Sequence, residues 1–394
     1  MVLAATARAQ GRLEVLDIRE GLIRSRVMLA ALGDVVAANA ARLRELLGVD
    51  LDMYKRTEQG LAEFQDLLAA APALEVLDAY VSSECCLTTR RLLRNEPPFG
   101  PLRMHGLAIE RDASGADFRA MLPELTRHRS LTALYVHTFG ETPLPTDEVD
   151  LVVDAALAAR FETLHFYQCG LTPSAASVLA RLLSSPALTD LGFLSDGGTE
   201  PLLDGPGYAL LADALRGNRT LRKLVLRSVV WLDAAAEVPA LFDALTGHAS
   251  LRSLECSEIV LAAVAGDDYE DLTGAALDAA SAVFGHAIGA LVAADAPALE
   301  KLKISFVDSG TDVLGPLVDA LPSNVHLQEL RLSHNDLTPM FAEQRLLPAV
   351  RANTSLRELY VSVPPEDHAL AKAVQHVKLR EAARSAAEAA AGNA

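Results

Sequence analysis

Apolar and polar residues alternate in a short cluster that recurs along the whole chain. The cluster is Leu-x-x-Leu-x-apolar, as in LEVLDI from Leu13, LRKLVL from Leu221 and LRELYV from Leu356. Eleven clear copies and a weaker one from Met104 start at 13, 43, 74, 104, 131, 161, 188, 221, 251, 299, 327 and 356. Ten of the eleven successive spacings lie between 27 and 33 residues, so the chain contains an internal repeat. The alternation predicts that each cluster forms a short β-strand.

The remainder of each repeat has helical spacing. Between residues 208 and 215, Leu211 and Leu215 lie four residues apart and therefore share one helix face. A turn-forming residue precedes the next cluster in several repeats, as at Gly217, Asn218, Gly247 and Asn353. We expect such residues to close the helices in the left-handed conformation. Strands that are joined through helices run parallel, which predicts an α/β fold.

A strand followed by a full helix within about 30 residues resembles the ribonuclease-inhibitor-like class of leucine-rich repeats. Asn335, in LQELRLSHNDLTP from Leu327, stands where this family has Asn or Cys, and Cys169 occupies the same position in LHFYQCGLTP. Other copies depart from the pattern, with Ser82, Val307 and Pro364 at that position. The resemblance covers about residues 10–365. It implies a right-handed solenoid, or horseshoe, of about twelve β-α repeats with a parallel inner sheet and outer helices.

The spacing of the elements predicts which side of the solenoid is concave. Neighbouring strands lie about 4.8 Å apart, whereas packed helices need about 8–10 Å. We therefore expect the strands to line the inner side of an arc. The resemblance implies that this inner face is the binding face.

Three segments differ from the regular repeat. Residues 1–12 resemble part of a repeat helix, and we expect a partial helix of a truncated or stub repeat. The single long spacing, 48 residues, predicts an insertion near residues 258–285 within the solenoid of residues 13–365. Residues 366–394 are expected to form a capping helix over 366–381 and a frayed alanine-rich tail.

Composition and charge narrow the class of protein. At 394 residues the chain exceeds the roughly 250–300 residues at which single cores stop growing, which favours a repeat array. A net charge of −17 disfavours nucleic acid, and no run of 18 apolar residues lacks charge, so we expect no membrane span. The first ten residues are too short and too quickly polar for a signal peptide, so we expect none there, and the cysteines, Cys85, Cys86, Cys169 and Cys256, lack zinc spacing. We expect a cytoplasmic monomer with reduced thiols.

Motifs for catalysis and cofactor binding are missing from the sequence. It contains no phosphate-binding loop, no HExxH and no GxSxG, so we expect neither an enzyme nor a bound cofactor. GDDYED, from Gly266, has the charge to attract a divalent cation but not the spacing of an EF-hand. We interpret it as a solvated loop or a protein-contacting loop. Cys256 occupies an apolar strand position and is expected to lie in the core.

The candidate site lies on the outward face of the predicted strands. The third, fifth and seventh residues of each cluster point to that face. Aromatic residues gather there on the third to sixth strands, namely Tyr80, Tyr135, His137, His165 and Tyr167. Tyrosine is enriched at binding hot spots, although strands also favour tyrosine without any binding role.

A second outward group is basic, with Lys301, Lys303, Arg331, Lys223 and Arg227. It is either a stripe that selects an acidic partner segment or a solvated face balanced by Glu255, Glu258 and Glu329. We include Arg227, Lys303 and Arg331 with the aromatic residues as candidate partner-binding residues.

These observations favour a non-enzymatic scaffold that binds another protein on its concave sheet. One alternative is a GTPase-activating protein of the Ran GTPase-activating type, because the resemblance extends to that family. Another is the sensor fragment of a larger receptor or effector.

Overall fold

The computed structural model divides into two compact units, residues 1–140 with 147–168, and residues 141–146 with 169–394. The structure describes residues 12–18, 26–50, 66–81, 90, 93–94, 103–111, 114–128, 130–138, 144–169, 171, 175–194, 205–227, 230–231, 234–258, 260–265, 268–305, 310–333, 335, 337–362 and 368–392. Each unit is treated separately below.

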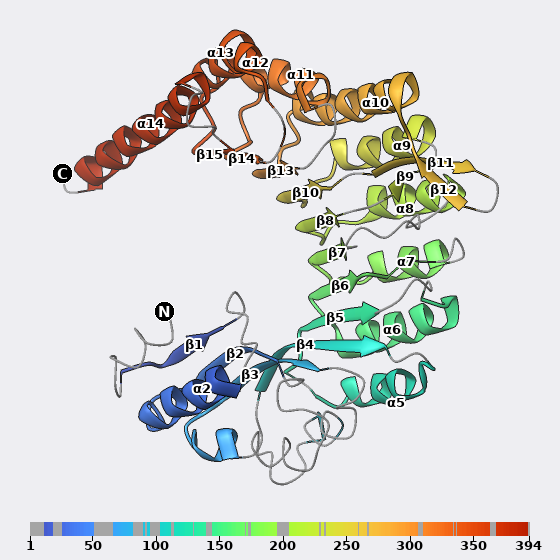
Figure 1. The fold of residues 1–394 in the computed structure, drawn as a ribbon, viewed down its shortest axis with the longest axis vertical. Helices are drawn as coiled ribbons and strands as arrows, with labels where there is room; N and C mark the ends of the chain where they lie inside the picture. Colours follow the sequence, from blue (N-terminus) through green and yellow to red (C-terminus); the bar gives the residue numbers. More distant parts are fainter. Residues whose placement is uncertain are drawn as a thin grey trace. The chain divides into compact units, whose positions relative to one another are not determined.

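In the first unit, parallel strands lie side by side in chain order (Figure 1). They are β1 (Val15–Asp17), β2 (Glu45–Asp50), β3 (Val76–Val81), β4 (Arg103–Arg111), β5 (Ala133–Thr138) and β6 (Thr163–Tyr167). The helices are α2 (Arg26–Ala38), α5 (Ala116–Leu125) and α6 (Thr146–Ala159). The first, fourth and sixth residues of a cluster are buried, as Leu131, Leu134 and Val136 show for β5.

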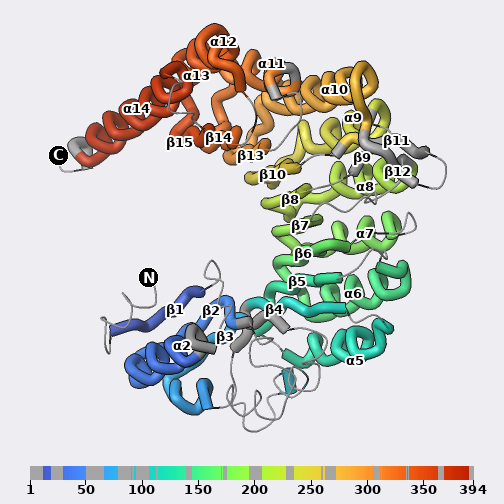
Figure 2. The backbone as a smooth tube through the Cα atoms, in the orientation of Figure 1, coloured from blue at the N-terminus to red at the C-terminus, as the bar shows by residue number. Residues whose placement is uncertain are grey.

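The second unit continues the alternation of strand and helix, which Figure 2 traces along the chain. Its parallel strands are β7 (Asp190–Leu194), β8 (Lys223–Arg227), β10 (Ser253–Ser257), β13 (Lys301–Ser305), β14 (Glu329–Leu332) and β15 (Glu358–Val361). Its helices include α7 (Ala175–Leu183), α8 (Gly205–Gly217), α9 (Ala234–Thr246), α10 (Gly274–Ala293) and α11 (Gly310–Ala320). The predicted α/β class is confirmed, and parallel strands alternating with helices fit a leucine-rich-repeat fold.

The turns that end the helices differ from the prediction. Asn353 has φ −70° and ψ 137°, and the positive-φ glycines among the described residues are Gly48, Gly115 and Gly274. The left-handed closure expected at Gly217, Asn218, Gly247 and Asn353 is therefore wrong. Asparagine is used here for its side chain instead.

The buried carboxamide of Asn218 shows what closes the turn. Its Oδ1 accepts the Leu221 N–H at 2.7 Å, and its Nδ2 donates to the Leu183 carbonyl of the preceding repeat at 2.6 Å. Asn324 and Asn353 make the same pair of contacts, to Leu327 and Val292 and to Leu356 and Leu321 respectively. Each asparagine thus joins its own strand to the repeat before it, and accepts a strand N–H that burial would otherwise leave unpaired.

The insertion forms regular structure rather than a loop. β11 (Val260–Ala265) pairs antiparallel with β12 (Asp268–Asp271) and parallel with β9 (Val230–Trp231), giving a small separate sheet. The apolar, partly β-branched sequence of β11 favours strand formation. Gly266 and Asp267, which connect β11 to β12, lie outside the described residues. The backbone of the GDDYED segment is therefore strand from Asp268 onward.

The insertion also lengthens helix α10 to 20 residues. By length and composition alone, α10 is long and apolar enough to span a membrane, the one such helix found among the described residues. Here it packs between α9 and α11. Two glycines of α10 permit its close packing on α11. A Cβ on Gly285 would lie 2.6 Å from the Val313 carbonyl oxygen, and a Cβ on Gly289 would lie 2.6 Å from Pro316 Cβ. We interpret α10 as a core helix of this unit.

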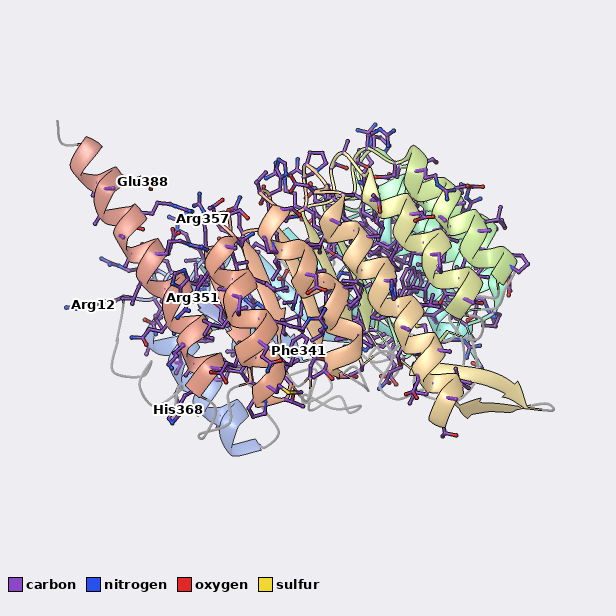
Figure 3. All side chains as sticks on the ribbon, turned by 90° about the horizontal axis from the view of Figure 1, so that it is seen from above. Arg12, Phe341, Arg351, Arg357, His368 and Glu388 are labelled. Atoms are coloured by element: carbon purple, nitrogen blue, oxygen red, sulfur yellow. The ribbon has the colours of Figure 1, made fainter. Side chains whose placement is uncertain are left out.

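The C-terminal helix is longer than predicted. A helical segment of α12 (Pro339–Phe341), a π-helical turn (Ala342–Leu346) and α13 (Leu347–Ala352) precedes β15. Helix α14 (His368–Gly392) then continues through the alanine-rich segment for which we expected fraying. Figure 3 shows it running beside α13, from His368 past Glu388. Arg380 donates to the Asn353 and Leu356 carbonyls, so α14 is joined to the turn between α13 and β15.

Candidate functional site

The face of the first unit's sheet carries four aromatic side chains on two neighbouring strands. Tyr135 and His137 come from β5, and His165 and Tyr167 come from β6. The backbone register places Tyr135 beside His165, and His137 beside Tyr167. We call these four residues the aromatic cluster. Their shared position on one face follows from the Leu-x-x-Leu-x-apolar repeat, because residues two apart on a strand point to the same face.

The rings of the aromatic cluster hold one another in fixed orientations. His137 stacks on Tyr167, with ring centroids 4.4 Å apart and planes 3° apart. His165 meets Tyr135 edge to face at 5.4 Å, and Tyr135 meets Tyr167 at 6.2 Å. Such pairs contribute about 0.5–1.5 kcal/mol beyond the area they bury. The four rings therefore pack against one another without a partner.

The four rings differ in exposure. His165 is only 6% exposed, so it contributes little accessible surface and instead packs against the Tyr135 ring. Tyr135, His137 and Tyr167 are each half-buried and present part of their surface to solvent. A surface of this kind offers large apolar area with polar tips, which suits contact with another polypeptide.

Sequence analysis did not single out Gly106 and Asp78 for the site. A Cβ on Gly106 would lie 3.2 Å from Tyr135 Cε2 and 3.6 Å from the Asp78 carboxylate, so both side chains lean over this glycine. Asp78 Oδ1 also accepts the Gly106 N–H at 2.7 Å. Glycine at an outward strand position is typical of a site where another group approaches the backbone closely. Gly106 is therefore the sequence signal that could have indicated this part of the site.

Two register shifts change where neighbouring residues fall. β2 is irregular between Leu46 and Val49, where Gly48 has φ +77°, and Val49 is buried rather than outward as counted from the cluster. A second shift, between β3 and β4, sets the backbone of Tyr80 opposite Ala108, in the row of Tyr135. The side chain of Tyr80 lies outside the described residues.

The candidate basic residues lie in the second unit and are paired with acids. Arg227 contacts Glu258 at 3.1 Å, Lys303 contacts Glu255, and Arg331 contacts Glu329 while stacking 4.3 Å above the Tyr360 ring. Lys301 also contacts Glu329, and this hydrogen bond raises the pKa of Lys301. These contacts match the alternative of a face balanced by glutamates.

The described cysteines are unsuited to nucleophilic chemistry. Cys169 and Cys256 are free thiols and buried, and burial raises the pKa of Cys256 far above its usual range. The core position expected for Cys256 is confirmed. Cys85 and Cys86 lie outside the described residues. Within the described part of the chain, no group of three His, Cys, Asp or Glu side chains converges in a way that suits a metal ion.

The turn residue expected from the family resemblance is present at Asn335. Its Nδ2 donates to the Ile304 carbonyl of the preceding repeat at 2.8 Å, and the residue is buried. Cys169, at the same position of its own repeat, is also buried. Ser82, Val307 and Pro364 lie outside the described residues.

No family model matches the chain, and no curated protein matches it. Among solved structures, actin-binding site 2 of leiomodin-1 is similar at 11% identity and a TM-score of 0.29, covering 55% of this chain and 94% of that one. A complex of TLR13 with ssRNA13 is similar at 14% identity and a TM-score of 0.28, covering 86% of this chain and 58% of that one. Likeness at this level transfers no function.

Proposed function

We propose that the chain is a non-enzymatic recognition scaffold of the ribonuclease-inhibitor-like leucine-rich-repeat type. It binds a partner protein on the sheet face of the first unit, centred on the aromatic cluster. The carrying observation is the geometry of that cluster, in which Tyr135 and Tyr167 are held by His165 and His137 yet stay partly exposed.

Physical chemistry supports binding at these two tyrosines. A tyrosine buries a large area while losing little rotamer freedom, and here neighbouring rings already limit that freedom. If both tyrosines are hot spots, truncation of either costs about 1–3 kcal/mol of binding free energy. The same truncation has little effect on the core, which consists of the inward leucines and phenylalanines of the same strands.

A site-specific cross-linking experiment tests the proposal. The photoreactive residue p-benzoylphenylalanine is introduced in place of Thr163, which is half-buried on β6 in the row next to His165. The matched control carries it in place of Leu151, which is 40% exposed on α6 of the same unit. We expect one dominant cross-linked protein from the Thr163 position and none from Leu151. Equal products from both positions, or products from Leu151 alone, contradict the proposed face.

A further inference from the structure

We propose that the second unit has a further binding site, which takes a phosphorylated segment of a partner protein through Arg219, Arg222 and Arg252. These arginines and Glu300 line a hollow of about 420 Å³, within the size range of ligand sites. We call it the arginine hollow. It shares no residue with the aromatic cluster, so the inference goes beyond the proposed function.

The repeat places two of these arginines side by side. Arg222 and Arg252 are the second residues of LRKL and LRSL, directly before β8 and β10. These strands pair in parallel, and the Arg252 N–H donates to the Arg222 carbonyl at 2.8 Å. Arg219 lies three residues before Arg222 and lines the same hollow. Three exposed arginines therefore border one hollow, at the edge of the sheet where the strands begin.

The positive charge of the arginine hollow is only partly balanced. Arg252 contacts Glu300 at 3.5 Å, whereas within the described part of the chain neither Arg219 nor Arg222 forms an ion pair. Arg219 instead donates to two backbone carbonyls of its own turn, which orient the side chain without offsetting its charge. Three arginines and one glutamate leave a net charge of +2. Like charges on neighbouring strands repel, so an anion between them would stabilise this arrangement.

A phosphate monoester matches this charge better than a single carboxylate. At pH 7 it carries a charge of about −1.5 to −2 and three acceptor oxygens, to which guanidinium groups donate in pairs. The hydroxyls of Thr220 and Ser250 already donate to the Ser185 and Leu221 carbonyls. The arginines are therefore the main donors that the hollow offers to a ligand.

The length of the arginine hollow favours a peptide over a free phosphate. Its lining extends from Pro186, ahead of β7, to Pro297, ahead of β13. Because β7, β8, β10 and β13 are successive neighbours in the sheet, the hollow covers three strand spacings, or about 14 Å. An extended chain advances about 3.3–3.6 Å per residue, so about four residues span this distance. The two prolines offer apolar contact to the residues that flank the phosphate.

The charge of the whole chain disfavours a nucleic acid as the ligand. At a net charge of −17, the protein repels the repeated phosphates that would extend beyond the hollow. A single phosphate interacts mainly with charges within one Debye length, about 8 Å at physiological salt, and in the hollow these are the arginines. An oligonucleotide is accordingly one of the competitors in the test.

Fluorescence anisotropy with the full chain tests the inference. Three peptides carry the same neutral dye at their N-terminus: GAASAAG-amide, the same sequence with phosphoserine, and GAEAEAG-amide, which has about the charge of the phosphopeptide. Unlabelled phosphopeptide, inorganic phosphate and an eight-nucleotide single-stranded oligouridine serve as competitors. All titrations are made at about 0.15 M salt, where distant charges are screened.

Two double variants complete the design. Arg219→Gln with Arg222→Gln removes two guanidinium groups and leaves the ion pair of the hollow in place. The matched control is Arg351→Gln with Arg357→Gln, at exposed residues of the same unit (Figure 3). Arg357 has the position in LREL that Arg222 has in LRKL, but the preceding repeat has glutamine beside it. Both variants have the same net charge, so a difference between them reports the hollow and not the overall field.

We expect the phosphopeptide to bind, the glutamate peptide to bind more weakly and the unphosphorylated peptide not to bind. The site variant should weaken phosphopeptide binding about five- to twentyfold more than its control, since each exposed ion pair contributes about two- to fivefold. No binding, equal binding of the phosphopeptide and the glutamate peptide, or equal weakening in both variants would overturn the inference. Competition by inorganic phosphate or oligouridine as strong as that by unlabelled phosphopeptide would overturn the choice of a peptide ligand. The Thr163 cross-link tests other residues, so the proposed function does not depend on this result.

Discussion

Replacing Gly289 by alanine tests the close packing of α10 on α11, and its outcome can be estimated from the structure. An added Cβ would lie 2.6 Å from Pro316 Cβ and 2.9 Å from the Pro316 carbonyl carbon. Both atoms belong to a rigid ring or to backbone, so neither can move aside cheaply. Alanine gains about 1 kcal/mol of helix propensity over glycine, while overpacking a core costs about 1–3 kcal/mol. We expect a net destabilisation of about 1–2 kcal/mol, which is the upper part of that difference.

The matched control for this prediction is Gly217→Ala at the end of α8. A Cβ on Gly217 would meet nothing within 4 Å, and its φ is not positive. We therefore expect stabilisation by about 0.4–1 kcal/mol, opposite in sign to Gly289→Ala. Urea denaturation followed by the fluorescence of Trp231, in β9 of the same unit, measures both variants. A Gly289→Ala variant as stable as the unmodified protein would refute the packing.

The remaining predictions concern the turns, pH and metal. Asn353→Ala should lower the free energy of unfolding by about 1–3 kcal/mol, measured by denaturation, because it leaves the buried Leu356 N–H without its acceptor and removes one donor from the Leu321 carbonyl; a neutral effect would contradict the role given to asparagine. Burial and the charge of Arg219 lower the pKa of His248, so the unfolded chain binds the proton more tightly and stability should fall as pH drops below about 6.5. His248→Asn keeps an acceptor for the Leu251 N–H and should flatten that pH dependence in denaturation midpoints; an unchanged slope would show that other groups cause it. Calorimetry should detect no submicromolar calcium binding, and tight binding abolished by Asp268→Ala would contradict this.

The repeat pattern predicted the elements because its signal is strong and local. Inward leucines at fixed offsets determine which side of each strand is buried, so the grouping of Tyr135, His137, His165 and Tyr167 followed from counting. The same counting failed where a strand carries an extra residue. Gly48 bends β2, and Val49 turns inward as a result.

Other features depended on contacts between repeats, which a single repeat does not reveal. The sequence alone predicts that Asn218 closes a helix, but its structural role depends on the Leu183 carbonyl, which lies 35 residues earlier. The sequence pattern does not predict the hairpin of β11 and β12, because its two strands are short and the second is acidic. Asp78 joins the site only through a contact between strands, because its carboxylate and the Tyr135 ring both lie within 4 Å of the position of a Gly106 Cβ.

The central claim, that the aromatic cluster binds a partner, is tested most directly by titrating the cross-linked partner against a double variant. Tyr135→Ala with Tyr167→Ala removes both exposed rings, and Tyr360→Ala, at a 43% exposed tyrosine of the second unit, is the control. Thermal unfolding first establishes that each variant remains folded. The account predicts at least about a tenfold loss of affinity for the double variant, equivalent to about 1.4 kcal/mol, and little loss for the control. Unchanged affinity in a folded double variant would contradict the claim.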